Sequence, residues 1–364
     1  MKRVVLLGAG HAHLHVLEAL AAQPLPAAEV TLVSPFAQFV YSGMVPGLIA
    51  GHYTAPQCTI PIAPLGERAG VARIEGTAVA LDAAQRVVTL ADGTQLGYDV
   101  LSLDTGPVID RDAIPGAREH ALFVRPIEHF VRLADPLVEL AQQRVLSLVV
   151  IGGGAGGAEL AMAWQHRLGE RARVSLVTGG EPPVASAPEA VRRRVRGALK
   201  RLRITVLEDS ATSITAGHVV LGSGTRLECD APVVAIGTSA PRWLAESGLA
   251  LDEAGFVATG PTLQSRSHAE VFAAGDVATR TDAPRPKSGV YAVRAGPPLA
   301  LNLRRFVAGG ALEPYAPQPR SLNLISCGAR SAIASWDRWS VEGRWVWWWK
   351  DRIDRAFVER FARR

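Results

Sequence analysis

The segment at residues 152–157, GGGAGG, has glycines at all three positions of a G-x-G-x-x-G motif. A β-branched apolar run precedes it, and a helix-forming run begins at Ala158. In such a turn Gly152 permits the sharp bend, Gly154 lets the backbone approach a pyrophosphate, and Gly157 lets the helix pack against its strand. The helix start also offers free N–H groups and a positive dipole end to the phosphates. This context predicts a dinucleotide-binding turn; a tight strand–helix turn in another kind of α/β domain is the alternative.

A second copy of the pattern opens the chain. The apolar run 4–7 leads into Gly8-x-Gly10, and a helix-forming segment follows. His13 stands where the third glycine would be, which predicts slightly looser packing of the strand against the helix. Two such turns predict two bound dinucleotides, and two dinucleotides in one chain predict electron transfer between them.

The strands that follow each turn lack a feature common in these sites. An acid at the end of the second strand usually holds a ribose hydroxyl. Ser34 and Thr178 occupy these two positions, so the sequence leaves NADH and NADPH open as donors. Further strands are predicted at 233–237 and 271–275, both ending in glycine, and Asp276 follows the second.

Composition limits the classes of protein to which this chain can belong. A chain of 364 residues with 48% hydrophobic residues, 35 Gly and 24 Pro predicts two to three globular domains with many turns. The net charge of +5 suits an anionic cofactor or an acidic membrane surface, and no nucleic-acid-binding motif is present. The three widely spaced cysteines (Cys58, Cys229, Cys327) argue against a disulfide framework and for a reducing, cytoplasmic location. We expect neither a signal peptide nor a transmembrane helix, because the apolar runs break at glycines of the two turns.

Taken together, these segments resemble the flavoproteins with two dinucleotide-binding domains that are related to the pyridine nucleotide-disulfide reductases. The resemblance runs from Val4 to about Phe306. It implies FAD at the first glycine turn, NAD(P)H at the second, a crossing between domains near Thr105 and Gly106, and an FAxGD element ending at Asp276 that holds the ribityl chain.

The implied architecture is an α/β fold with two Rossmann-like domains and a small C-terminal α+β interface region. We expect residues 1–110 and 241–310 to form the FAD-binding domain and residues 111–240 the NAD(P)H-binding domain. Residues 311–364 would form the interface region, with a Trp-rich basic amphipathic helix.

Finer details narrow the resemblance. Residues 35–50 contain no cysteine, so the Cys-x4-Cys pair of the disulfide reductases is missing. The chain is more similar to type II NADH:quinone dehydrogenases and sulfide:quinone reductases. Segments 11–13, 41–44, 287–294 and 350–355 resemble flavoprotein modules found alone or fused to selenophosphate synthetase. The synthetase half is absent from this sequence, so selenium chemistry does not follow.

The resemblance also implies roles for single residues. Glu159 would lie near the nicotinamide and Lys287 near the pyrimidine edge of the flavin, where a cation stabilises the reduced form; a first-turn helix acid and an exposed structural lysine are the alternatives. The residues expected to bind FAD are Gly8, Gly10, His13, Ser34, Ser42, Gly43, Val79, Thr105, Gly106, Gly275, Asp276, Tyr291 and Ala292. Those expected to bind NAD(P)H are Gly152, Gly154 and Gly157.

The other histidines and the cysteines give little indication of a further site. His11 and His15 share a helix face, but no carboxylate or cysteine completes a metal site, so we predict none. The three cysteines do not match the pair that sulfide oxidation needs, and Cys327 alone is a weak candidate for a flavin contact.

Two basic segments have open interpretations. The helix predicted at 188–203 has seven basic residues from Arg192 onward, which form either a solvated face or a docking face. The C-terminal tryptophans and the helix at 350–364 form either a packed interface or an anchor at the inner face of a membrane.

The sequence therefore predicts an FAD-dependent NAD(P)H dehydrogenase that passes electrons to a quinone or a similar small acceptor. Two alternatives stay open: a flavoprotein that oxidises sulfide or selenium compounds, and a non-enzymatic redox-sensing flavoprotein.

Overall fold

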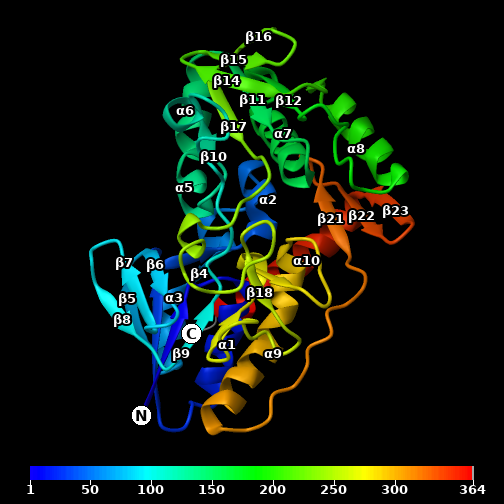
Figure 1. Ribbon diagram of the computed structural model, residues 1–364. Coiled ribbons are helices and arrows are strands. Elements are labelled where there is room, and N and C mark those ends of the chain that lie inside the picture. Colours follow the sequence, from blue (N-terminus) through cyan, green and yellow to red (C-terminus); the bar gives the residue numbers. More distant parts are fainter. Residues whose placement is uncertain (363–364) are drawn as a thin grey trace.

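The computed structural model describes residues 1–362 and has two lobes, each built on a parallel five-stranded sheet (Figure 1). The first lobe has strand order β19-β9-β1-β2-β5. Its strands are β1 (Lys2–Leu7), β2 (Ala28–Ser34), β5 (Ala72–Glu75), β9 (Val100–Leu103) and β19 (Val271–Ala273). The apolar run that precedes Gly8 therefore forms the central strand of this sheet.

Helices cover one face of the first sheet and a small antiparallel sheet covers the other. The helices are α1 (His11–Ala22), α3 (Ile62–Arg68) and α9 (Gly289–Ala308); the small sheet is β6 (Ala78–Asp82), β7 (Val87–Leu90) and β8 (Gln95–Gly97). Leu6 and Leu32 of the sheet are buried with Leu14 and Leu17 of α1 on the helical side. Leu101 is buried with Val88 on the other side.

The second lobe repeats this plan with strand order β10-β17-β11-β12-β13. Its parallel strands are β10 (Leu122–Phe123), β11 (Leu146–Ile151), β12 (Ala172–Val177), β13 (Thr205–Leu207) and β17 (Ala231–Val234). Its helices are α5 (Ile127–Arg132), α6 (Ala134–Gln143), α7 (Ala155–Leu168) and α8 (Glu189–Arg201), and its antiparallel sheet is β14 (Ala211–Thr215), β15 (His218–Leu221) and β16 (Arg226–Glu228). This is the predicted α/β fold with two Rossmann-like units.

Short elements complete the lobes. They are β3 (Gln38–Val40), α2 (Val45–Ile49), β4 (Thr59–Pro61), α4 (Ala117–His120), β18 (Val257–Thr259) and β20 (Ala278–Arg280), with 3-10 turns η1 (Ser42–Met44), η2 (Ala55–Cys58), η3 (Gly169–Arg171), η4 (Arg242–Leu244) and η5 (Gly275–Val277).

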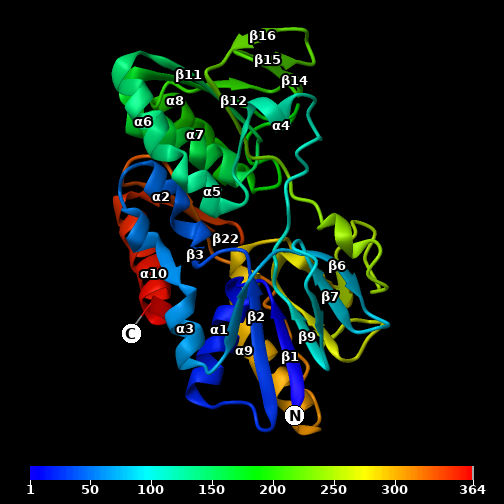
Figure 2. The same cartoon turned by 90° about the vertical axis from the view of Figure 1, so that its left-hand side faces the viewer.

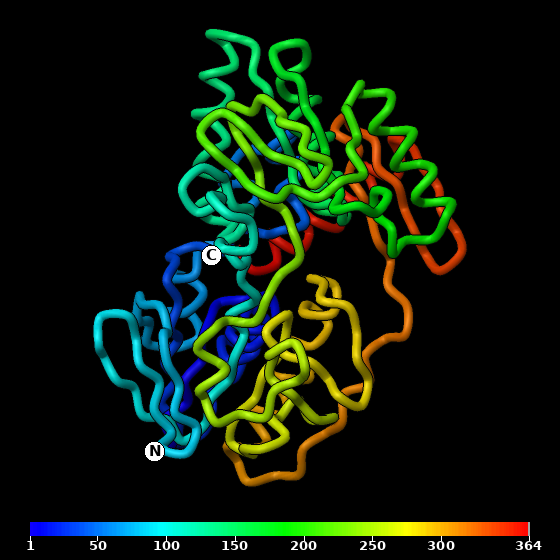
Figure 3. The backbone as a smooth tube through the Cα atoms, turned by 45° about the horizontal axis from the view of Figure 1, so that its top comes forward, coloured from blue at the N-terminus to red at the C-terminus, as the bar shows by residue number. Residues whose placement is uncertain are grey.

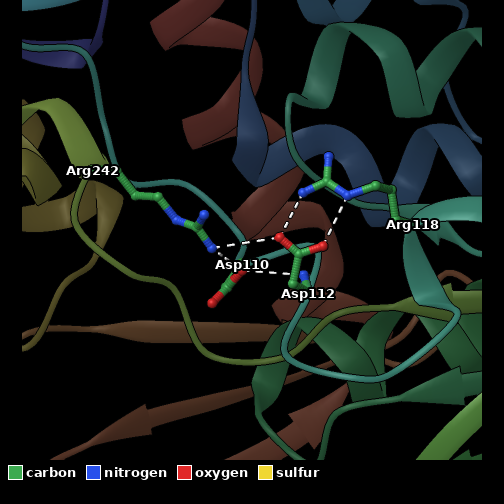
Figure 4. Close-up of polar contacts among 4 residues, drawn as sticks. All are labelled: Asp110, Asp112, Arg118 and Arg242. Carbon is green, nitrogen blue, oxygen red and sulfur yellow. Dashed lines mark hydrogen bonds and ion pairs between the residues drawn. The ribbon is translucent and has the colours of Figure 1, made fainter.

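Two neighbouring strands of chain connect the lobes. Val108, on the way out of the first lobe, exchanges backbone hydrogen bonds of 2.9 and 2.8 Å with Ser239, on the way back. Arg242 adds ion pairs to Asp110 at 3.1 Å and Asp112 at 3.5 Å (Figure 4). These charged groups are exposed, so they contribute little stability, and the backbone bonds fix the crossing. The predicted domain boundaries near 110 and 240 fall at this crossing and stay a proposal.

The C-terminal region is an α+β unit formed by β21 (Asn323–Ser326), β22 (Ala332–Trp336), β23 (Trp339–Gly343) and α10 (Arg344–Ala362). The segment after α9 runs along the outside of the molecule to reach it (Figure 3). Arg194 of α8 donates hydrogen bonds to Ser340 of β23, and Arg201 pairs with Glu342. Part of the basic helix face therefore docks on this chain's own C-terminal hairpin.

Helix α10 begins at Arg344, earlier than predicted, and packs against β4 of the first lobe as well as β22 (Figure 2). Its buried residues include Trp347 and Phe361. Arg363 and Arg364, the end of the predicted helix, lie outside the described residues. No helix within residues 1–362 is long and apolar enough to cross a membrane.

Candidate functional site

A cavity of about 660 Å³ lies at the carboxyl ends of the strands of the first sheet. Ligands of doubly wound sheets bind at this edge, and the volume is within the range of ligand pockets, about 300–1,000 Å³. Its walls come from the first glycine turn, from both crossing strands and from the start of α9. Predicted residues that line it are Gly8, Gly10, Ser34, Ser42, Thr105, Gly106, Asp276 and Ala292.

The first glycine turn is pressed against the end of β9. Gly8 has a φ of +90°, and a Cβ there would come within 2.5 Å of the carbonyl oxygen of Asp104. A Cβ on Gly10 would come equally close to the carboxylate of Asp104. The backbone N–H of Gly10 also donates to the Asp104 carbonyl at 3.2 Å. Only glycine fits at these two positions, so the backbone stays bare where it faces the cavity.

His13 fills the place of the third glycine with hydrogen bonds. Its side chain is fully buried, with Nδ1 2.5 Å from the carbonyl oxygen of Gly8 and Nε2 2.8 Å from Oγ of Ser102. Burial lowers the pKa of His13 to about 4, so the ring is neutral at pH 7. The expected loose packing is replaced by an imidazole bridge between β9 and the turn. His13 does not line the cavity, so it supports the glycine turn from the side of the protein interior.

One end of the cavity lies beside β2. The Ser34 hydroxyl there donates to the carbonyl oxygen of Phe36 at 3.2 Å. Thr77 and Ala78 line this end. Val79, which was expected to contact the adenine through its backbone, is the next residue along the chain and is not among those that line the cavity. Trp243, from the returning chain, also lines the cavity.

The other end lies between η1, η5 and the start of α9. Ser42, Asp276 and Gly289 line it. Burial raises the pKa of Asp276 above its usual range. Gly43 lies next to this end, but its carbonyl oxygen accepts a hydrogen bond from Nζ of Lys350 at 2.6 Å, so it connects η1 to α10.

Lys287 faces away from the large cavity. Its Nζ donates to the carbonyl oxygen of Ala278 at 2.6 Å and to Oγ1 of Thr279 at 2.8 Å, and it lies 3.9 Å from the centre of the Phe256 ring. It lines a small neighbouring cavity of about 60 Å³, together with Gly275 and Tyr291. Burial lowers the pKa of Lys287 to about 8. The ammonium thus braces β20, the strand that directly follows η5.

The second glycine turn has an open outer surface. Gly152 has a φ of +138°, and a Cβ on Gly157 would come within 1.9 Å of the Gly152 carbonyl oxygen, so glycine lets α7 approach β11. Gly154 and Gly156 are exposed, and a Cβ on either would meet no atom within 4 Å. The start of α7 is therefore accessible to an anion.

Thr178, at the end of β12, is turned inward. Its hydroxyl lies 2.5 Å from the carbonyl oxygen of Glu181 and 3.3 Å from that of Leu207. The Thr178 hydroxyl is therefore already bonded to the protein backbone, and its position lacks the acid that would select a free 2′-hydroxyl.

Glu159, on α7, faces the C-terminal unit. Its Oε1 accepts the backbone N–H of Ser326 at 2.8 Å. Burial raises the pKa of Glu159 to about 7, and the charge of Lys350 on α10 opposes that rise. Lys350 itself is buried and bonded to Asp354 at 2.5 Å. Glu159 therefore lies where the second lobe, β21 and α10 meet.

Two cavity residues were missed by the sequence reasoning. Arg125 lines the large cavity just before α5, and its guanidinium makes no hydrogen bond or ion pair with any residue in 1–362. No local pattern distinguishes it from the other arginines. Asp104 also lines the cavity, and it had a signal, because it is an acid directly after the apolar strand that ends at Leu103.

The cysteines and histidines form no further site in the described chain. All three cysteines are buried and unpaired, and burial raises the pKa of each thiol to about 12. Within residues 1–362, no group of three or more His, Cys, Asp or Glu side chains could hold a metal ion.

Comparison with known proteins places these sites in a family context. A model of the family pyridine nucleotide-disulphide oxidoreductase matches residues 2–296. Demethylphylloquinone reductase NdbB of Synechocystis sp. is 26% identical over 349 residues, which cover 92% of this chain and 86% of that protein. An NADH dehydrogenase-like protein of Mycobacterium tuberculosis is 29% identical over 303 residues, covering 76% and 73%. The sulfide:quinone oxidoreductase of Aquifex aeolicus superposes with a TM-score of 0.82 at 20% identity, covering 100% of this chain and 92% of that one, which shows a shared fold.

Proposed function

This chain belongs to the pyridine nucleotide-disulphide oxidoreductase family, whose members use FAD and NAD(P)H, and we propose that it is a dehydrogenase that delivers electrons from NAD(P)H to a quinone or a similar small acceptor. The observation that carries the proposal is the pairing of two glycine turns. One borders a dinucleotide-sized cavity, and the other is open to solvent.

The cavity of the first lobe suits FAD. The bare backbone of Gly8 and Gly10 lies where α1 begins, and a helix start favours a pyrophosphate. Arg125 supplies a cation that has no partner among the described residues. Asp276 supplies carboxylate oxygens that can accept hydrogen bonds from ribityl hydroxyls. We assign the Ser34 end to the adenosine and the Ser42 end to the flavin.

The second turn suits an exchangeable nicotinamide nucleotide. Gly152, Gly154 and Gly157 would hold its pyrophosphate at the start of α7. When both groups are bound, the chemistry is hydride transfer from the nicotinamide to the flavin, which the cofactors supply themselves. The protein's part is to orient the two rings and to exclude water.

Two side chains have supporting roles in this proposal. Glu159 holds a proton on its carboxyl group near neutral pH, at the junction of α7 and α10. Lys287 positions the Asp276 turn through its bonds to β20, and it acts on the cofactor only indirectly.

A quinone is the acceptor that the relatives favour, because the similar Synechocystis protein is named a demethylphylloquinone reductase. The three cysteines argue against sulfide oxidation, because buried thiols of raised pKa are poor nucleophiles. The similarity of four short segments to modules fused with selenophosphate synthetase stays a prediction.

The test is an anaerobic absorbance titration of the FAD-loaded protein with NADH and, separately, with NADPH. We expect one or both to bleach the flavin band, and a water-soluble quinone to restore it. A bound flavin that neither nucleotide bleaches would favour a redox-sensing role. A protein that takes up no FAD would refute the proposal.

We also propose that a tryptophan face contacts an anionic membrane surface. This face consists of exposed side chains on β22, β23 and α10: Trp336, Trp339, Trp345, Trp348, Trp349 and Ile353. Exposed arginines flank it, namely Arg338, Arg344 and Arg352. Tryptophan and arginine together are typical of surfaces that lie at the lipid headgroups. Phe357 and Phe361 of α10 do not belong to this face, because they pack against His15 of the first lobe.

Flotation with vesicles tests this contact. Replacing Trp339, Trp345 and Trp348 together by serine should abolish co-flotation with anionic vesicles. The matched control is Val79→Ser, which removes an exposed apolar side chain from the first lobe and should float like the parent protein. Equal flotation of the triple variant and the parent would contradict the assignment.

A further inference from the structure

The carboxyl group of Asp104 occupies an unusual place in the first lobe. It follows β9 directly, it is only 3% exposed, and it lines the large cavity. Three chain segments meet around it. Oδ2 accepts the backbone N–H of His13 in the first turn of α1 at 2.9 Å, and Cβ atoms placed on Gly10 or Gly275 would lie 2.5 Å from Oδ1. The carboxyl group thus caps α1 from another strand, because Gly10, the N-cap residue, has no side chain to do so.

This position creates an electrostatic conflict with the proposed function. The helix start that Asp104 caps is the one assigned to the pyrophosphate of FAD, and a buried carboxylate beside a phosphate anion is repelled. No described cation forms an ion pair with Asp104. The groups that act on it are the backbone N–H groups of Ala12 and His13 on α1 and the carboxyl of Asp276 in η5. Arg125 and Lys287 are the cations that act on Asp276.

We propose that Asp104 is a cofactor-binding residue that acts as a neutral carboxylic acid: it accepts the N–H of His13 with one oxygen and donates its own proton toward the pyrophosphate of FAD with the other. Binding of FAD is then coupled to one proton on this side chain. The inference rests on the proposed function, since it assumes that FAD occupies this cavity.

Burial raises the pKa of Asp104 well above its usual range, and the nearby Asp276 raises it further, while the N–H groups of Ala12 and His13 act in the opposite direction. The neutral form of Asp104 is therefore favoured up to a higher pH than that of an exposed aspartic acid. Above the pKa that Asp104 has in the FAD-free protein, the affinity for FAD should fall by up to tenfold per pH unit, because one proton must be taken up for each FAD bound.

Three variants separate this role from simple packing. Asp104→Asn keeps an acceptor for His13 and a donor for the phosphate but cannot titrate, so its FAD dissociation constant should vary less than about twofold with pH. Asp104→Ala loses both bonds and should bind FAD at least about tenfold more weakly at every pH, as expected for a lost hydrogen bond to a charged group. Asp276→Asn is the matched control: it removes another carboxylate that lines the cavity and should keep a pH slope.

The measurement is the dissociation constant of FAD by quenching of flavin fluorescence, from about pH 5 to pH 10, on the full-length protein. Calorimetry in two buffers of different ionisation enthalpy gives the protons taken up per FAD. The proposal is supported if the FAD dissociation constant of the parent protein depends on pH and that of Asp104→Asn does not. If the variant fails to fold, uptake of nearly one proton per FAD by the parent protein supports it.

Equal pH slopes in the parent and Asp104→Asn, or no proton uptake at any pH, would overturn it. In both cases FAD still binds, so the proposed function survives. A parent protein that binds no FAD at any pH overturns both.

Discussion

Replacing His13 by alanine should destabilise the first lobe more than most single substitutions in this chain. The imidazole is fully buried and bridges the carbonyl oxygen of Gly8 and the hydroxyl of Ser102 at 2.5 and 2.8 Å. Truncating a large buried side chain costs about 2–5 kcal/mol, and each buried polar group left without a partner costs about 1–3 kcal/mol. Because these contributions overlap, we expect a loss of about 3–5 kcal/mol in the free energy of unfolding.

A double-mutant cycle separates the hydrogen bond from the packing. Ser102→Ala alone should cost about 1–2 kcal/mol, because it leaves Nε2 of His13 buried without a partner. In the double variant both partners are gone, so its total cost should be smaller than the sum by about 1 kcal/mol. His13→Gly, which restores the third glycine of the motif, should be no more stable than His13→Ala, since glycine inside a helix costs about a further 1 kcal/mol.

The assay is urea unfolding of the FAD-saturated protein, followed by tryptophan fluorescence and by the release of flavin fluorescence. The two signals report on the whole chain and on the first lobe. His120→Ala, at an exposed histidine, is the control and should change the stability by less than about 0.5 kcal/mol. A His13→Ala variant within about 1 kcal/mol of the parent, or a cycle without coupling to Ser102, would refute the assignment of the imidazole as a bridge.

Three further predictions follow from the same geometry. Burial lowers the pKa of His13 to about 4, whereas a histidine in the unfolded chain titrates near 6.5. The contribution of the neutral ring to the free energy of unfolding is therefore complete above pH 6.5 and is lost as the pH falls toward 4. At pH 5, thermal melts should show a loss of about 2 kcal/mol in the free energy of unfolding that His13→Ala lacks. The pKa of Glu159 is raised to about 7, so flavin reduction by NAD(P)H should show an inflection near pH 7 that Glu159→Gln removes in stopped-flow traces. Because Thr178 offers neither an acid nor a cation to the ribose, kcat/KM for NADH and NADPH should differ by less than about tenfold, and Thr178→Asp should favour NADH in steady-state assays.

The two glycine turns could be predicted from the sequence because their constraints are local. A positive φ at Gly8 and Gly152 and the close contact at Gly157 depend on residues that directly follow an apolar strand. The same signals predicted the two Rossmann-like units that contain the sheets. The spacing of the motif did not predict the structural role of His13, because that role depends on a hydrogen bond with Ser102, which is 89 residues away in the sequence.

The directions of longer side chains could not be predicted. Lys287 was placed at the flavin by resemblance, yet its ammonium is bonded to β20. Glu159 was predicted near the nicotinamide, but its carboxylate accepts the backbone N–H of Ser326. No pattern in the sequence indicates that the segment around Ser326 packs against α7. In each case the direction of the side chain depends on contacts from distant parts of the chain.

The two turns differ in a way that bears on how the lobes work. Beneath the first turn lie His13 and Asp104, both buried and hydrogen-bonded, and the turn borders the cavity of about 660 Å³. The second turn has glycine alone, and Gly154 and Gly156 are exposed on it. A dinucleotide held by braced, desolvated contacts dissociates slowly, whereas one held by an open helix start exchanges readily. This asymmetry supports a resident FAD in the first lobe and a nicotinamide nucleotide that enters and leaves the second in each turnover, which is the division of labour that a dehydrogenase of this kind requires.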